Sequence, residues 1–199
     1  VNWAVKNKYP IFGSVDTHSY KHWEFKGSKQ LGPKGEASPG FPVHCVKGTN
    51  GWQKIGETIV RKGVFVPSVK IPFMDLCNLW NDHEDAQAWY MEKNDYSLWT
   101  NPNADYILGT LINDAFYLKK ENLDFVVFGV ATDYCVKEAC LGLVKLLDRW
   151  SIPLSRRSVA LATDACAAVA PESQGLALVV IENSGVVLKM TREVIGNDC

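Results

Sequence analysis

The chain has 199 residues, 47% of them hydrophobic, and a formal net charge of −1, which are values typical of one folded globular domain. The near-neutral charge, without a basic stripe, argues against nucleic acid or an acidic membrane surface as a partner. No apolar run approaches the ~20 residues of a membrane span, and residues 1–10 lack the apolar centre of a signal peptide. We therefore expect a cytoplasmic protein.

Six cysteines are spread along the chain, and none forms a C-x-x-C pair. The even count permits a disulfide framework, but a chain of this size does not need such cross-links. Reduced thiols are the better interpretation, and they leave one cysteine available for chemistry. The six are Cys45, Cys77, Cys135, Cys140, Cys166 and Cys199.

Short apolar runs alternate along the chain with amphipathic stretches of helical period. The predicted strands, in chain order, cover residues 11–15, 59–60, 64–66, 88–92, 125–129, 159–162 and 186–190. The predicted helices cover residues 73–80, 107–118, 134–147 and 172–182. Residues 26–40, rich in Gly, Pro and Lys, predict a surface loop, and residues 55–83 as a whole are hard to interpret.

The alternation of strands and helices predicts an α/β fold, a doubly wound parallel sheet with helices on both faces. The chain lacks an initiator Met and opens on what reads as the tail of a helix, at Trp3, Ala4 and Val5. We therefore expect a first strand and most of a helix to be missing upstream. The prediction is a single domain over residues 1–199 that is incomplete at its N-terminus.

Ligands of such sheets bind outside the carboxyl ends of the strands. Asp16, Lys93 and Asp164 each end or follow a predicted strand. The segment before Cys135 follows another strand, so we expect these residues to lie on one rim of the sheet.

Cys135 lies between a strand and a helix, in the run GVATDYCV of residues 129–136. Backbone N–H groups at a helix N-terminus stabilise a thiolate and can hold an oxyanion. A buried, inert cysteine is the alternative. We expect that inert state for Cys140 and Cys166, which lack this setting.

The run 129–136 resembles the nucleophile segment of the isochorismatase-like cysteine hydrolases, which include the nicotinamidases. Residues 16–22, DTHSYKH, resemble the D-x-H…H metal segment of nicotinamidases. Residues 41–49, FPVHCVKGT, resemble their segment with a further metal histidine. Residues 92–99, EKNDYSLW, resemble the K-x-x-Y-S-x-F segment that carries the catalytic lysine. The likeness runs from about residue 9 to about residue 170.

The resemblance implies a divalent metal, Zn²⁺ above all and Fe²⁺ or Mn²⁺ as alternatives, since imidazole and carboxylate ligands suit these ions. The implied ligands are Asp16, His18, His44 and His22. Glu24 is a substitute for His22, because the spacing of this ligand varies in the family. His83 fits no motif and is expected to be a solvated loop residue.

For catalysis the resemblance implies Cys135 as the nucleophile and Lys93 as the catalytic lysine, with Lys62 in its Lys-Gly pair as the alternative. It also implies a cis peptide bond between Val130 and Ala131, which in the family turns the Ala131 N–H toward the oxyanion beside the Cys135 N–H.

Several residues are candidates for contact with the substrate. Phe41 matches an aromatic position that packs on the substrate ring in the family. The other candidates are Val130, Tyr134, Tyr96 and Trp99. For the three aromatic residues among them, packing in the core is an equal alternative.

The family's triad is Asp, Lys and Cys, and its Asp ends the first strand, ahead of everything in this chain. Asp16 matches the metal ligand instead, and family patterns give the base role to neither Asp133 nor Asp95. We therefore expect the base upstream of residue 1.

The reaction that the resemblance implies is amide hydrolysis through a thioester, most of all of nicotinamide to nicotinate and ammonia. A related hydrolase acting on another amide, a carbamoyl group or a vinyl ether is the alternative. Two further possibilities are a binding protein that has lost its base and an interaction module. The expected partners are a small-molecule amide substrate and further copies of the chain, since members of the family commonly oligomerise.

Overall fold

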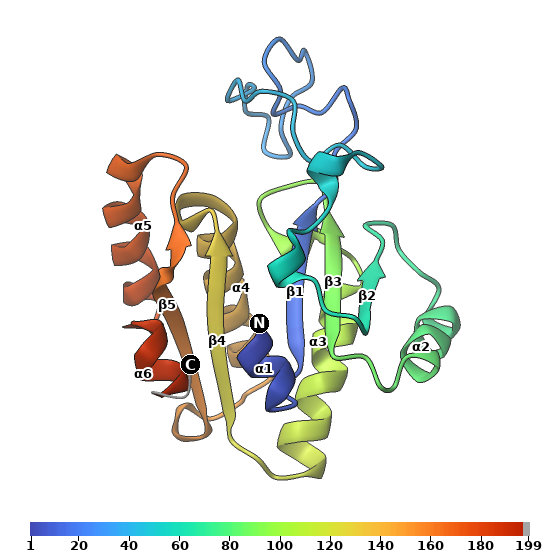
Figure 1. Cartoon of the computed structure of the whole chain (residues 1–199), viewed down its shortest axis with the longest axis vertical. Helices are drawn as coiled ribbons and strands as arrows, with labels where there is room; N and C mark the ends of the chain where they lie inside the picture. Colours follow the sequence, from blue (N-terminus) through green and yellow to red (C-terminus); the bar gives the residue numbers. More distant parts are fainter. Residues whose placement is uncertain (197–199) are drawn as a thin grey trace. The chain divides into compact units, whose positions relative to one another are not determined.

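The computed structural model describes residues 1–196 and divides the chain into two compact units, Val1–Ala104 and Asp105–Cys199. Each unit contains a three-stranded sheet whose strands all run parallel (Figure 1). The predicted α/β class with parallel strands is therefore confirmed, although the strands belong to two sheets. The prediction of one hydrolase domain over residues 1–199 stays a prediction.

The sheet of the first unit has the strand order β1-β3-β2. Its elements are α1 (Asn2–Lys6), β1 (Ile11–Asp16), β2 (Gly63–Val66), α2 (Phe73–Asp82) and β3 (Ala88–Lys93). All six residues of the central strand β3 are buried, so both faces of this strand are covered. The register pairs Asp16 with Lys93, so both residues lie at the carboxyl end of the sheet.

Apolar and amide side chains hold the first unit together. Trp80 of α2 stacks on Trp89 of β3 with 5.0 Å between ring centroids. The buried amide of Asn101 donates hydrogen bonds to the carbonyl oxygens of Val66 (3.2 Å) and Glu92 (2.8 Å). This amide therefore ties together the carboxyl ends of β2 and β3.

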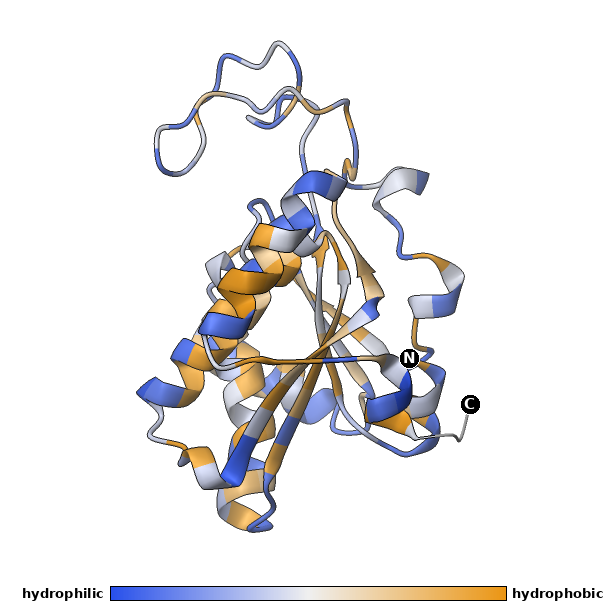
Figure 2. Ribbon diagram, turned by 90° about the vertical axis from the view of Figure 1, so that its left-hand side faces the viewer, coloured by the Kyte–Doolittle hydropathy of each residue, from blue (hydrophilic) through white to orange (hydrophobic). Residues whose placement is uncertain are grey.

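Residues 17–49, between β1 and a 3₁₀ turn at Asn50–Trp52, form a long excursion without a helix or a strand (Figure 1). Figure 2 shows that hydrophobic residues concentrate along the strands and helices, and that much of this excursion is hydrophilic or neutral. The prediction of a surface loop over residues 26–40 is confirmed. Strands were also predicted at 59–60 and 64–66, and only the second is present, as β2.

The second unit has the strand order β4-β5-β6, and α4 and α5 pack against each other and against its sheet. Its strands are β4 (Leu123–Val130), β5 (Arg157–Ala167) and β6 (Val187–Lys189). Its helices are α3 (Ala104–Ile112), extended by a π-helical turn (Asn113–Leu118), α4 (Lys137–Arg149), α5 (Pro171–Asn183) and α6 (Thr191–Ile195). No helix within residues 1–196 has the length and apolar character needed to cross a membrane.

Residues 125–129 lie within β4, as predicted, and exposed side chains alternate along this strand, with Val126 and Phe128 42% and 44% exposed. One expectation about the strands is wrong. Asp164 was expected at a carboxyl strand end, but β5 continues to Ala167. The Asp164 carboxylate instead accepts hydrogen bonds from the backbone N–H (2.7 Å) and hydroxyl (2.8 Å) of Thr191, where α6 begins.

Candidate functional site

Three histidines and a glutamate gather just beyond the carboxyl end of β1. The ring of His18 lies 3.9 Å from that of His22 and 5.1 Å from that of His44, measured between centroids. The two carboxylate oxygens of Glu24 lie 3.9 Å from His22 Nδ1 and 3.9 Å from His44 Nε2. Ligand atoms of His18, His22 and Glu24 all lie within 4.8 Å of one another. We call these four residues the histidine–glutamate cluster.

Backbone hydrogen bonds bring the distant part of the excursion to His18. The N–H of His18 donates to the carbonyl oxygen of Cys45 (3.0 Å), and the N–H of Lys47 donates to the carbonyl oxygen of His18 (3.0 Å). These bonds form a short parallel bridge between His18 and Val46. His44 is thereby held beside His18 although 26 positions separate them in the sequence.

Two carbonyl oxygens orient the imidazoles of the cluster. His22 Nε2 lies 2.7 Å from the carbonyl oxygen of Asn94, and His44 Nδ1 lies 2.9 Å from that of Pro42. A carbonyl oxygen only accepts, so each of these ring nitrogens carries the hydrogen. The remaining nitrogen of each neutral ring then has a lone pair, and both of these nitrogens face Glu24.

Several polar atoms of the cluster are buried without a hydrogen-bond partner among the described residues. They are both ring nitrogens of His18, Nδ1 of His22 and Oε1 of Glu24. Each such atom costs about 1–3 kcal/mol when it is left unsatisfied. A single divalent cation would satisfy one ring nitrogen of His18 together with Nδ1 of His22 and Oε1 of Glu24, and nitrogen and oxygen donors of these types suit Zn²⁺, Fe²⁺ or Mn²⁺. The residues present therefore fit a metal.

The electrostatics of the cluster favour the neutral imidazoles that bind metals. Burial, reinforced by the neighbouring His22, lowers the pKa of His18 to about 4. Burial also lowers the pKa of His22. Burial and the nearby carboxylate of Asp16 raise the pKa of Glu24 to about 7. A bound cation would offset this cost of ionising Glu24.

Asp16, predicted as a metal ligand, forms an ion pair with Lys93. The Lys93 side chain is 2% exposed, and its ammonium also donates to the carbonyl oxygen of Asp95 (2.9 Å). A buried ammonium requires such partners. Lys62, the alternative catalytic lysine, is exposed at the amino end of β2 and pairs with Asp85. Lys93 thus lies beside Asp16 and Lys62 does not, and the catalytic role of Lys93 stays a prediction.

Two side-chain contacts anchor the excursion to the sheet. The ammonium of Lys47 donates to both carboxylate oxygens of Glu92 (2.9 and 2.7 Å), which is buried on β3. The indole N–H of Trp52 donates to the hydroxyl of Thr17 (3.0 Å), between Asp16 and His18. One contact therefore holds the segment that carries His44, and the other holds the segment that carries His18.

In the second unit, Cys135 lies in a π-helical turn, Thr132–Val136, that leads from β4 into α4. The N–H groups of Tyr134 (3.1 Å) and Val136 (3.0 Å) donate to the carbonyl oxygen of Ala131. The peptide bond between Val130 and Ala131 is cis, as predicted. The strand–turn–helix setting predicted for Cys135 is therefore present.

Asp133 connects this turn to the start of α5. Its carboxylate accepts hydrogen bonds from the hydroxyl of Ser173 (2.5 Å) and from the N–H groups of Val169 (3.0 Å) and Ala170 (3.3 Å). Burial acts to raise the pKa of Asp133, but these three donors outweigh it and hold the pKa below its usual value. Asp133 thus fixes the segment that carries Cys135.

The other cysteines differ in their surroundings. Cys140 is fully buried on α4, and burial raises the pKa of its thiol to about 12, as befits a core residue. Cys166 is half-buried, and burial raises the pKa of its thiol as well. Cys135 is half-buried. Cys199 lies outside the described residues.

The residues predicted to contact the substrate have varied surroundings. The ring centroids of Phe41 and His44 lie 6.0 Å apart. Tyr96 and Trp99 lie near other aromatic rings of the first unit. Tyr134 is half-buried and Val130 is exposed. Their contact with a substrate stays a prediction. His83 is exposed outside the cluster, as predicted.

No protein-family model and no curated protein matches the sequence. Solved structures do match. The zinc complex of pyrazinamidase from Pyrococcus horikoshii superposes with a TM-score of 0.58 at 19% identity, over 96% of this chain and 80% of that one. PnC1 from L. infantum in complex with nicotinate gives 0.57 at 19% identity, over 94% and 76%. An isochorismatase family protein from Desulfovibrio vulgaris gives 0.54 at 12% identity, over 97% and 77%. The chain shares their fold.

This result confirms the fold that the sequence motifs implied. The shared fold is the isochorismatase-like α/β fold, and nicotinamidases and pyrazinamidases are among the solved structures that have it. Fold alone does not assign a reaction.

Proposed function

We propose that the protein is a metal-dependent cysteine hydrolase of the isochorismatase-like family that converts nicotinamide and water to nicotinate and ammonia. The observation that carries the proposal is the histidine–glutamate cluster, in which two oriented imidazoles turn their lone pairs toward Glu24. Beside them, the ring nitrogens of His18 have no hydrogen-bond partner among the described residues. The motif around Cys135 and the likeness to pyrazinamidase and to the nicotinate-bound PnC1 support the choice of substrate.

The nucleophile of the proposed reaction is the thiolate of Cys135. Its Sγ attacks the carboxamide carbon, and the backbone N–H groups of Ala131 and Cys135 receive the developing oxyanion. The C–N bond then breaks, ammonia leaves with the added proton, and water hydrolyses the thioester to release the carboxylate. The resemblance implies an Asp as the base that accepts the thiol proton, with Lys93 stabilising its charge.

The proposed metal ligands are His18, His22, His44 and Glu24, with Zn²⁺ as the expected ion. When bound, the metal would supply a Lewis acid that orients the substrate's ring nitrogen and polarises a water molecule. Lys93 holds Asp16 at the end of β1, two residues before His18. Phe41 provides an aromatic surface beside the cluster.

Ammonia release from nicotinamide by the zinc-loaded protein and by two cysteine variants tests the role of Cys135. Cys135→Ala should lower kcat by at least about 10³-fold, because the thioester cannot form. Cys77→Ala is the matched control, since Cys77 is also half-buried but lies on α2. Equal turnover by the Cys135→Ala variant and the wild type would overturn the assignment of the nucleophile.

A further inference from the structure

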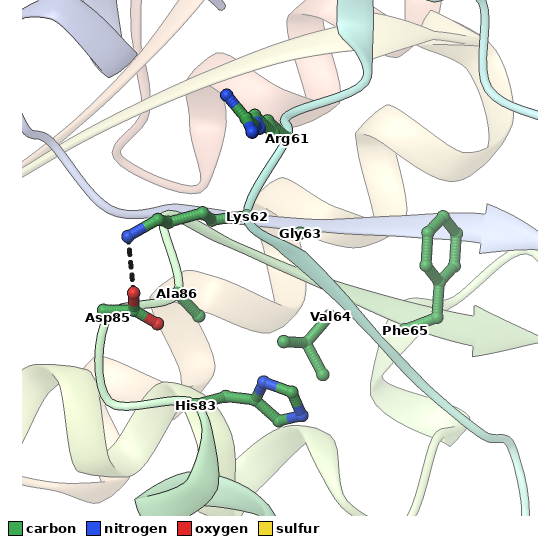
Figure 3. Close-up of a pocket in the computed structure, with 8 residues that line it drawn as sticks. All are labelled: Arg61, Lys62, Gly63, Val64, Phe65, His83, Asp85 and Ala86. Atoms are coloured by element: carbon green, nitrogen blue, oxygen red, sulfur yellow. Dashed lines mark hydrogen bonds and ion pairs between the residues drawn. The ribbon is translucent and has the colours of Figure 1, made fainter.

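A second candidate binding site lies at the amino end of the first unit's sheet. A pocket of about 380 Å³ opens where the chain enters β2 and where the turn after α2 leads into β3. Figure 3 shows the side chains around it, from the segment 61–65 and from the turn 83–86. Its volume falls within the range of small-molecule sites, at the lower end.

This pocket is separate from the histidine–glutamate cluster. The pocket adjoins Ala86, just before β3 begins, whereas the cluster follows the carboxyl ends of β1 and β3. Six residues of strand span roughly 16 Å at about 3.3 Å per residue. A small molecule in the pocket therefore cannot also contact the cluster.

The charged side chains of the pocket favour a singly charged anion. Lys62 and Asp85 neutralise each other in an ion pair of 2.5 Å (Figure 3). The exposed guanidinium of Arg61 makes no hydrogen bond or ion pair with any residue that the structure describes. One unpaired cation beside a carboxylate suits a carboxylate ligand better than a doubly charged phosphate. A guanidinium also matches the two oxygens of a carboxylate.

The rest of the lining combines apolar side chains with the imidazole of His83. Val64 and Phe65 of β2 line the pocket, and Phe65 is 37% exposed. The ring of Phe65 is fixed by Tyr90 and Trp52, at centroid distances of 5.1 and 6.0 Å. β2 is an edge strand, so alternate backbone N–H groups face away from β3 and can donate to an anion.

We propose that this pocket binds a small organic monocarboxylate. Its carboxylate pairs with Arg61 and the outward N–H groups of β2, and its apolar body lies against Phe65. The proposal is independent of the reaction proposed for Cys135.

Titration of the isotopically labelled protein with benzoate, followed by amide NMR shifts, tests the proposal. The amide signals of Gly63 and Phe65 should shift in a saturable way, with a Kd of about 1 mM or tighter. Arg61→Ala should weaken benzoate binding at least about tenfold. The matched control is Arg192→Ala, which removes an exposed arginine of α6 and should bind benzoate as the wild type does.

Two further titrations identify the ligand class. Formate, which lacks the apolar body, should bind at least about tenfold more weakly than benzoate. Inorganic phosphate should also bind more weakly than benzoate. The proposal is overturned if benzoate leaves these signals unshifted, if the Arg61→Ala and wild-type proteins bind benzoate equally, or if formate or phosphate binds as tightly as benzoate.

Discussion

The Nε2 atom of His22 lies 2.7 Å from the carbonyl oxygen of Asn94, the residue that directly follows Lys93. The end of β3 thereby fixes the tautomer of His22 and leaves its Nδ1 free to bind a cation beside Glu24. Metal-binding histidines commonly donate the N–H of the other ring nitrogen to a carbonyl or carboxylate oxygen in this way. The predictions below follow from this arrangement and from the contacts that surround it.

Removal of the His22 imidazole should abolish tight zinc binding. We expect His22→Ala to weaken zinc affinity by more than about 100-fold, since even the loss of a group that is hydrogen-bonded to a ligand costs about 10–100-fold. Isothermal titration with Zn²⁺ measures the change. His83→Ala is the matched control, because His83 is exposed outside the cluster. If both variants bind zinc equally, the cluster is not the metal site.

Replacing the carboxylates of Glu24 and Asp16 by neutral amides should affect different properties, zinc affinity for Glu24 and stability for Asp16. Glu24→Gln should weaken zinc binding by about 100-fold, because it replaces a ligand carboxylate. Asp16→Asn should chiefly lower the free energy of unfolding, by about 3 kcal/mol, because it leaves the buried ammonium of Lys93 without its carboxylate. Zinc titration and denaturant unfolding of both variants separate these effects. Loss of zinc binding in the Asp16 variant alone would restore Asp16 as the ligand.

The ion pair between Lys47 and Glu92 should hold the backbone segment that carries His44. Lys47→Met removes the cation from the buried carboxylate, and zinc affinity should fall by up to about tenfold as the segment loosens. Lys21→Met is the control, since Lys21 is exposed in the same excursion. Equal zinc affinity of the two variants would show that the anchor does not position the cluster.

Asp133 should stabilise the second unit in a pH-dependent way. Asp133→Asn should lower the free energy of unfolding by about 2 kcal/mol near neutral pH, because it weakens three hydrogen bonds to a carboxylate. The pKa of Asp133 is lower in the folded state than its ordinary value of about 3.9. Its stabilising contribution is therefore fully present above that value and is lost as the pH falls through the folded pKa.

Denaturant unfolding of the wild type and the Asp133→Asn variant between neutral and acidic pH measures this difference. The gap between the two proteins should close in acid. A gap that is constant with pH, or that widens in acid, would contradict the assigned role of the carboxylate.

The parts of the fold that depend on local pattern could be predicted from the sequence. The apolar run that forms β3 and the helical period of α5 identify those elements without any knowledge of their neighbours. The exposure of alternate side chains of β4 could not be predicted, because it depends on which elements cover that face of the strand. The position of Asp164 likewise depends on its contact with Thr191, 27 residues further along the chain.

The candidate site was likewise predictable from the sequence only in part. His18, His22 and His44 could be identified because they belong to motifs. The ion pair of Asp16 could not, because its partner Lys93 lies 77 residues away in the sequence. A backbone carbonyl such as that of Asn94 leaves no signal in the sequence.

Ammonia release from nicotinamide, measured before and after removal of the metal, tests the central claim most directly. The zinc-loaded protein should release ammonia, lose this activity on treatment with a chelator and recover it when Zn²⁺ is restored. Absence of ammonia release from a protein with zinc bound, or release that is indifferent to the chelator, would contradict a metal-dependent nicotinamide hydrolase.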